Sequence, residues 1–268
     1  MTKHLTLSHD TEYVYEEPIS YGLQQLRLTP KTLGGQTIKS WAVDVEGGTK
    51  ELEFDDQHNN RVVLIRAAPD CRHIKIRCEG EVEVEDRGGV LGRHTHSAPL
   101  WLYRRQTTLT KPGARLRSLV KSVSRDGKDD IEVLHSLLSQ IAESIEYSKG
   151  ETRTGTSAED AVAIGKGVCQ DHAHIMIGAA RLLEFPARYV SGYVLLPEDA
   201  EQSAGHAWAE VHVPHLGWVG FDVSNKKSPD DHYIRVACGL DYNEAAPVSG
   251  LTFGTPAEKL SVRLQVQQ

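Results

Sequence analysis

The spacing of apolar residues along the chain changes near residue 110, and this change limits the folds that the chain can adopt. Before that point apolar residues alternate with polar ones, as in "SWAVDVEGG" (40–48) and "HIKIRCEGEVEVEDRGG" (73–89). Period two over short segments that end in turn residues predicts antiparallel strands with one face exposed to water. We therefore expect residues 1–110 to form an antiparallel β-sandwich.

Beyond residue 110 the period becomes helical. In "DDIEVLHSLLSQIAESIEY" (129–147) apolar residues recur at helical spacing, and Asp129 and Asp130 are candidates for the helix cap. Helices followed by strands, without βαβ alternation, predict an α+β domain over residues 111–268, with a buried helix packed on an antiparallel sheet. Its expected strands cover residues 187–195, 206–213, 218–223, 232–238 and 259–266.

Composition and charge exclude several classes of function. The 268 residues carry a formal net charge of -7 and no Lys/Arg cluster, which argues against a nucleic-acid surface. No apolar run approaches the ~18 residues that span a bilayer, and the N-terminus does not resemble a signal peptide, so we expect a cytoplasmic protein without a membrane partner.

The sequence offers no clear metal or cofactor site. The four cysteines, at 71, 78, 169 and 238, form no C-x-x-C pair, which argues against a zinc or redox motif. His94 and His96 are two residues apart, but without a third ligand we interpret them as a solvent-facing or hydrogen-bonded pair. We expect no metal and no cofactor.

The decapeptide "GKGVCQDHAH" (165–174) places Cys169 just before an apolar run, "AHIMIGAARLLEF" (173–185). A helix that is apolar on nearly every face is buried, and Cys169 would stand at its first turn. The unpaired N–H groups and partial positive charge of a helix N-terminus favour a thiolate and could hold an oxyanion. Taken alone, the pattern fits a small buried hydrophobic residue equally well.

A nucleophilic cysteine needs a base and a group that orients the base. His172, three residues along the same helix, and His206, at the start of "HAWAEVHV", are the two candidate bases. Asp222, in the following strand, could orient His206.

Three blocks of the second half resemble the bacterial transglutaminase-like superfamily of papain-fold cysteine enzymes. They are "GVCQDHAHIMIGAARLLEFPARYVSGYV", "GHAWAEVHVPHLGWVGFDVSN" and "HYIRVACGLDYNEAAPVSG". The first half is similar to the β-rich N-terminal domain of one bacterial branch. The resemblance implies a thiol enzyme that acts on amide bonds of a peptide or protein, with its Cys, His and Asp at Cys169, His206 and Asp222.

The resemblance also bears on the residues around this triad. It favours His172 as a site wall over His172 as the base, and Trp208 is a second wall candidate. Gln170 could lend its side-chain amide to the oxyanion hole. The chain departs from the family pattern at Val223, where many relatives have proline, and at Leu240, where many have arginine.

The hairpin between residues 206 and 223 allows an independent test. A regular four-residue loop over 214–217 would place Asp222 and His206 on opposite faces of the sheet. A shift of one residue flips every side chain, so the triad requires a bulge or a loop of three or five residues.

The favoured function is peptide or amide hydrolysis through a thioester, because relatives with this domain pairing are usually described as protease-like. Transfer of the acyl group to an amine shares the first step, and an inactive peptide-binding module on the same fold is the third alternative. A sandwich that covers the cleft would favour autoregulation, and a remote one would favour partner docking.

Overall fold

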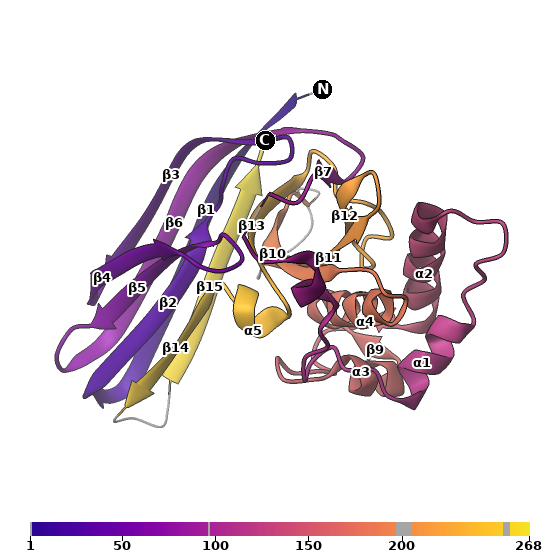
Figure 1. Ribbon diagram of the computed structural model, residues 1–268. Helices are drawn as coiled ribbons and strands as arrows, with labels where there is room; N and C mark the ends of the chain where they lie inside the picture. The colour runs from indigo at the N-terminus through magenta and orange to yellow at the C-terminus, as the bar shows by residue number, and fades with distance from the viewer. Residues whose placement is uncertain (1, 96, 197–204, 254–257) are drawn as a thin grey trace.

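The computed structural model describes residues 2–95, 97–196, 205–253 and 258–268. A β-sandwich lies beside an α+β core, and the helices between residues 114 and 182 gather on the side of the core sheet away from the sandwich (Figure 1). Both the sandwich and the α+β class expected from the sequence are confirmed. Among the described residues, no helix is both long enough and apolar enough to cross a membrane.

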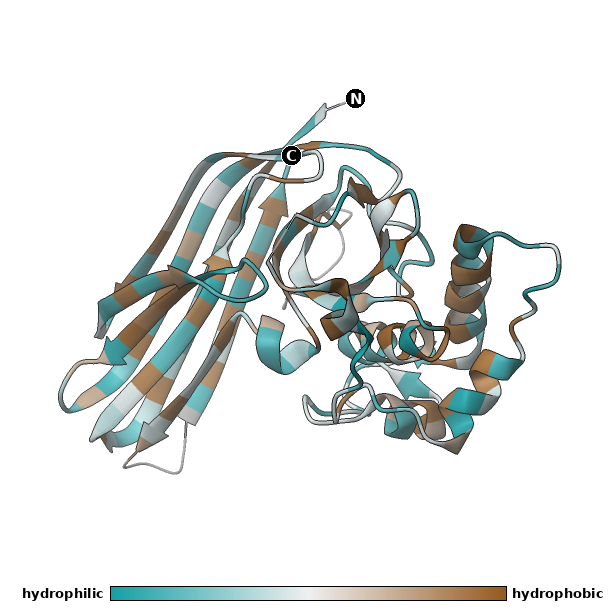
Figure 2. Cartoon of the chain, viewed as in Figure 1, coloured by the Kyte–Doolittle hydropathy of each residue, from teal (hydrophilic) through white to brown (hydrophobic). Residues whose placement is uncertain are grey.

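The sandwich consists of two four-stranded antiparallel sheets. Apolar and polar residues alternate along its strands (Figure 2), and in the first strand Leu5, Leu7, Tyr13 and Tyr15 all point into the core. In sheet order, one sheet contains β15 (Glu258–Gln267), β1 (Thr2–Ile19), β6 (Cys71–Glu85) and β3 (Gln36–Glu46), and the other contains β14 (Val248–Phe253), β2 (Tyr21–Thr29), β5 (Arg61–Ala67) and β4 (Gly48–Asp55).

Sheet membership departs from the division expected at residue 110. The strand expected at 259–266 is present as β15, but it pairs with β1 of the sandwich, and β14 pairs with β2. In the other direction, β7 (Val90–Gly92) pairs with β12 of the core. Local periodicity identifies a strand but carries no information about its partner, so these exchanges could not be read from the pattern.

The core sheet is antiparallel, and α4 packs against its strands β10 and β11. The sheet order is β13 (Tyr233–Gly239), β10 (Ala187–Val194), β11 (His206–Val213), β12 (Gly217–Phe221) and β7. The remaining elements are η1 (Leu100–Arg104), α1 (Ala114–Lys121), α2 (Asp130–Ser144), β8 (Glu146–Tyr147), α3 (Ala158–Ile164), β9 (Lys166–Gly167), α4 (Cys169–Leu182) and α5 (Tyr242–Ala245).

Two helices behave as their sequences predict. Asp129 caps α2: its side chain accepts from the Glu132 N–H, and the Glu132 side chain accepts from the Asp129 N–H, both at 2.9 Å. In α4 every residue from Asp171 to Arg181 is buried, because α1, α2 and α3 cover the face that the sheet leaves open. The all-round apolar character of this helix reflects that position.

The sandwich covers the edge strand β13 of the core sheet with two side-chain amides. Gln36 donates to the Arg235 carbonyl at 2.9 Å and accepts from the Arg235 N–H at 2.8 Å. Asn60 makes the same pair of bonds to Cys238, at 2.7 and 2.8 Å. These amides replace the neighbour strand that an edge lacks, and they fix the sandwich against the core.

Candidate active site

Cys169 is the first residue of α4, and the local sequence explains why the helix begins there. Gly165 ends α3 with a left-handed backbone (φ 74°), and Val168 is extended. The Asp171 carboxylate accepts from the Val168 N–H at 2.8 Å and from the Thr152 hydroxyl at 2.6 Å. Cys169 is therefore held at the positive end of a buried helix, where it remains partly exposed.

His206 and Asp222 meet because the loop of their hairpin contains an odd number of residues. Val213 pairs with Gly217, which leaves the three residues 214–216 as the loop, and Ala209 pairs with Phe221. This register places Asp222 across from Trp208 and diagonal to His206, and the His206 Nε2 lies 2.6 Å from the Asp222 Oδ2. The expected shift from a regular four-residue hairpin is confirmed.

The hydrogen bonds around Asp222 set the charge of the pair. The buried carboxylate accepts from the His206 Nε2–H, from the Tyr233 hydroxyl at 2.7 Å and from the Asn225 Nδ2 at 2.7 Å. Burial by itself would raise the pKa of Asp222, but these bonds outweigh it and lower that pKa. Asp222 thus stays ionised beside His206.

His206 is held in its protonated form. Burial lowers its pKa, but hydrogen bonds to Asp222 and Cys169 and the two negative charges outweigh this effect and raise the pKa to about 10. Because Nε2 faces Asp222, Nδ1 is the ring nitrogen left for the Cys169 sulfur. The three residues singled out from the sequence therefore form one continuous chain of contacts.

The turn after Asp222, where this chain has Val223 in place of the family proline, is held by Asn225. Val223 is buried, and Asn225 uses both its backbone N–H and its side-chain amide to bind the Asp222 carboxylate. Tyr233, on β13, was missed by the sequence reasoning. It lies eleven residues beyond Asp222, and a tyrosine at the start of an apolar strand gives no local signal of this contact.

The other three candidate site residues, Gln170, His172 and Trp208, lie in different places. His172 is buried and binds the Ser224 hydroxyl at 2.9 Å and the Ile145 carbonyl at 3.2 Å, so both ring nitrogens are engaged. Gln170 lines the cleft but donates its amide to the Thr154 carbonyl at 2.9 Å. Trp208 is buried behind His206, with ring centroids 6.2 Å apart. Trp208 does not line the cavity that holds Cys169.

Cys169 and His206 open into one cleft of about 240 Å³. The core supplies the side of the cleft that bears these two residues, and the sandwich supplies Arg27 and Leu28 of β2 and His9 of β1. Leu240, the second departure from the family pattern, does not line this cleft; it packs with Tyr103 and Trp218.

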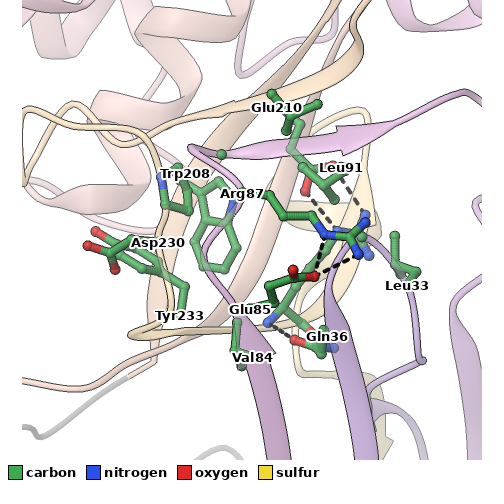
Figure 3. A pocket seen from close by; sticks show the side chains of 15 residues that line it. Leu33, Gln36, Val84, Glu85, Arg87, Leu91, Trp208, Glu210, Asp230 and Tyr233 are labelled. Carbon is green, nitrogen blue, oxygen red and sulfur yellow. Dashed lines mark hydrogen bonds and ion pairs between the residues drawn. The ribbon is translucent and has the colours of Figure 1, made fainter. Parts of the chain in front are cut away.

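A second pocket lies between the sandwich and the core (Figure 3). Trp208, Tyr233 and Glu210 come to it from the core, and Arg87 and Gln36 come from the sandwich side. At about 60 Å³ it has room for a few waters only. It is a small gap in the interface between the sandwich and the core, and it is too small for a peptide.

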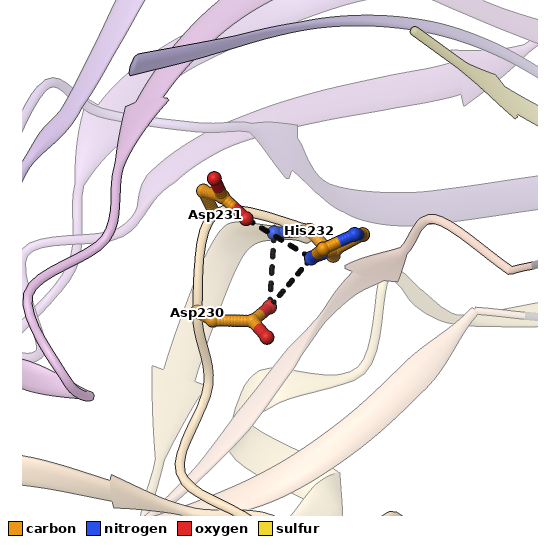
Figure 4. Close-up of side chains that lie close together, drawn as sticks. All are labelled: Asp230, Asp231 and His232. Carbon is orange, nitrogen blue, oxygen red and sulfur yellow. Dashed lines mark hydrogen bonds and ion pairs between the residues drawn. The ribbon is translucent and has the colours of Figure 1, made fainter. Parts of the chain in front are cut away.

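Two histidine groups outside the cleft are bound to protein partners. His94 donates to the Ala98 carbonyl at 2.6 Å and accepts from the Trp218 indole at 3.1 Å, while His96 lies outside the described residues. The His232 Nδ1 contacts Asp230 and Asp231 at 3.0 Å (Figure 4), and its Nε2 lies 2.8 Å from the Lys3 amine. This second group links the loop before β13 to β1.

Two family models match the chain: the transglutaminase-like superfamily over residues 117–223, and the bacterial transglutaminase-like N-terminal region over residues 5–83. The core of the chain is thus similar to the transglutaminase-like superfamily. The core match contains Cys169, His206 and Asp222, and the N-terminal match falls within the sandwich.

Relatives of this chain are found among mycobacteria. An uncharacterized protein of Mycobacterium leprae is 26% identical over 96% of both chains. One from Mycobacterium tuberculosis is 34% identical over 133 residues, 46% of this chain and 42% of the relative. Among solved structures, a candidate cysteine protease from Cytophaga hutchinsonii aligns with a TM-score of 0.79 and 19% identity, over 100% of this chain and 92% of the other. At that identity the likeness shows a shared fold.

Proposed function

We propose that this protein is a thiol hydrolase that cleaves peptide or amide bonds through Cys169, His206 and Asp222. The observation that carries the proposal is the contact chain from a helix-terminal cysteine through His206 to a buried, ionised Asp222, open to a cleft. Neither an isolated thiol nor a packing cysteine requires such an arrangement.

The first half-reaction follows from these positions. The Cys169 thiolate, paired with the His206 imidazolium, attacks the carbonyl carbon, and the carbonyl π electrons move to oxygen. N–H groups at the start of α4, which have no intrahelical acceptors, stabilise that oxyanion. As the C–N bond breaks, the His206 imidazolium gives its proton to the departing amine, and a thioester remains on Cys169.

In the second half-reaction the neutral His206 takes a proton from water, and the hydroxide oxygen attacks the thioester. The C–S bond breaks, which releases the acid and restores the thiolate–imidazolium pair. Asp222 stabilises the imidazolium in both halves and fixes the ring with Nε2 toward itself. An amine in place of water would give acyl transfer by the same steps.

The reactivity of Cys169 is the first test of the proposal. We would follow iodoacetamide labelling from about pH 4 to 9 in the native protein, His206→Ala and Cys169→Ala, and count labelled sites by mass spectrometry because three other thiols are present. Fast labelling of Cys169 alone, slowed in His206→Ala, is the expected result. Labelling no faster than a free thiol, and indifferent to His206, would leave a peptide-binding module.

A second measurement separates hydrolysis from acyl transfer. The native protein is incubated with a peptide library in the presence and absence of a fluorescent primary amine, with Cys169→Ala as the control. We expect Cys169-dependent cleavage with little incorporation of the amine. Predominant amine incorporation would assign the protein as an acyltransferase instead.

A further inference from the structure

The sandwich contributes polar side chains to the lining of the cleft. Two of its polar side chains, His9 and Arg27, line the same cavity as Cys169. The sandwich is therefore part of the site and not a remote docking module, and the nature of these two side chains bears on which substrates the cleft accepts.

His9 adds no charge to the side of the cleft that the sandwich forms. Its ring binds the Tyr193 hydroxyl at 2.7 Å and the Thr11 hydroxyl at 3.0 Å. Burial lowers the pKa of His9 to about 4, so the ring is neutral at physiological pH. Arg27, in contrast, contributes a positively charged guanidinium.

The guanidinium of Arg27 is ion-paired at Nε and hydrogen-bonded at both Nη groups. It donates to the Ser249 hydroxyl at 3.1 Å and to Gln25 at 2.9 Å, and its Nε lies 3.5 Å from the Asp56 carboxylate. The buried Nε–H has no hydrogen-bond partner in the described structure, and the side chain is 11% exposed. This Nε–H is inaccessible to a ligand, so only the two Nη groups, each with a second N–H beyond the bonds named, can meet a substrate.

Asp56 is the counter-ion of Arg27, but it does not line the cleft that holds Cys169. Its two oxygens accept from the His58 N–H, the Asn60 N–H and the Asn60 side chain, each at 2.9 Å. These bonds hold the loop between β4 and β5. Among the described lining residues on the sandwich side, Arg27 is therefore the charged side chain that a substrate in the cleft can meet.

The rest of the cleft is mostly aromatic or apolar. Tyr189, Tyr193 and Tyr242 come from the core, and Leu28, Val236 and Pro247 complete the lining near Arg27. Such walls suit the apolar stem of a side chain or a backbone, with one fixed charge to orient its end.

We propose that Arg27 binds a carboxylate of the substrate, so that the preferred acyl donor is an acidic peptide. The inference rests on the proposed function, since it assigns the chemistry of the substrate that reaches Cys169. A guanidinium and a carboxylate form paired, charge-assisted hydrogen bonds, which an amide of the same shape cannot match. Both a Glu or Asp side chain and a peptide C-terminus could supply the group.

Three matched affinity labels test the inference on the full-length protein. Bromoacetyl-glutamate α-amide carries a side-chain carboxylate, bromoacetyl-glutamine carries a terminal carboxylate, and bromoacetyl-glutamine α-amide carries neither. We expect one of the two anionic labels to alkylate Cys169 about tenfold faster than the neutral label. The faster label identifies which carboxylate the cleft accepts.

Two variants assign the preference to Arg27. In Arg27→Gln the anionic and neutral labels should react at equal rates, and Arg27→Lys should regain part of the preference because it restores the charge. An unchanged rate with the neutral label shows that the site around Cys169 is intact. A purely structural role for Arg27 would alter all three rates together.

The outcomes keep this inference separate from the proposed function. The ratio of rates is defined even for an ordinary thiol, so the absolute rate reports on the activation of Cys169 and the ratio reports on Arg27. Equal rates in the native protein, or a preference that survives Arg27→Gln, would overturn the inference. Slow labelling by all three reagents, with the ratio intact, would contradict the hydrolase alone.

Discussion

At the scale of single residues, the state of His206 depends on how firmly Asp222 is held. The carboxylate accepts from Tyr233 and Asn225 as well as from the histidine, and each bond favours its ionised form. Tyr233 is therefore a positioning residue: it touches Asp222, and it reaches the thiol only through His206.

Tyr233→Phe tests this role. Loss of one hydrogen bond to a buried charge weakens the hold of Asp222 on the imidazolium, and we expect labelling of Cys169 near neutral pH to slow by roughly tenfold. The pH profile of labelling is the measurement, since a merely structural defect would lower the rate without shifting the profile. Tyr21→Phe, at an exposed tyrosine of the sandwich, is the control and should match the native protein.

The raised pKa of His206 also predicts how stability changes with pH. The folded protein keeps a proton on His206 up to about pH 10, whereas the unfolded chain loses it near the ordinary value of 6.5. This stabilisation is fully present below pH 6.5 and is lost as the pH rises toward 10.

Urea unfolding at about pH 6 and about pH 9.5 measures this effect. The free energy of unfolding should fall more between these values in the native protein than in His206→Gln, because other titrating groups are common to both. A difference between the two proteins that stays constant with pH would show that His206 is not held protonated.

At the scale of elements, α4 positions Cys169, and it depends on close packing to do so. Gln106 donates to the Gly178 carbonyl at 3.1 Å, and Arg181 donates to the Thr110 hydroxyl at 2.9 Å. The segment before α1 thus lies directly on the helix. A methyl group at Gly178 would overlap the Thr110 carbonyl oxygen and crowd Leu116.

Gly178→Ala should therefore destabilise the protein, although alanine is the better helix former. We expect a loss of about 1–3 kcal/mol in the free energy of unfolding, measured by urea titration. Gly155→Ala, in a loop with open space around it, is the matched control and should be near neutral. If both variants were equally stable, the contact between the segment and the helix would not exist in solution.

At the scale of the whole molecule, each of the two parts of the chain supplies strands to the sheets of the other. β14 and β15 return from the core to extend both sheets of the sandwich, and β7 extends the core sheet. Apolar residues of β10 and β13, among them Tyr193 and Ile234, belong to the sandwich core. The arrangement places the sandwich wall of the cleft at a fixed distance from Cys169.

Gln36→Leu tests the attachment of the sandwich to β13. Leucine would leave the Arg235 N–H and carbonyl without partners in a buried interface, at a cost of about 1–3 kcal/mol for each group. We expect the midpoint of urea unfolding to fall, while Gln57→Leu at an exposed neighbouring turn leaves it unchanged. A native midpoint in Gln36→Leu would mean that water replaces the amide at no cost.

The sequence by itself indicated the strands of the sandwich, helices α2 and α4 and strands β10 to β13, and its family resemblance singled out the three residues of the contact chain. Alternation of apolar and polar residues marked the sandwich strands, and a run that is apolar on every face marked α4. For His206 and Asp222 to share a face, the hairpin loop before Asp222 had to contain an odd number of residues or the strand had to carry a bulge. These signals are local, because they depend on which face of one element a side chain occupies. Only the tertiary structure decided the partners: β14 and β15 in the sandwich, Tyr233 on Asp222, and Arg27 in the cleft. Contacts between residues distant in sequence come from the packing of whole elements, which no local pattern encodes.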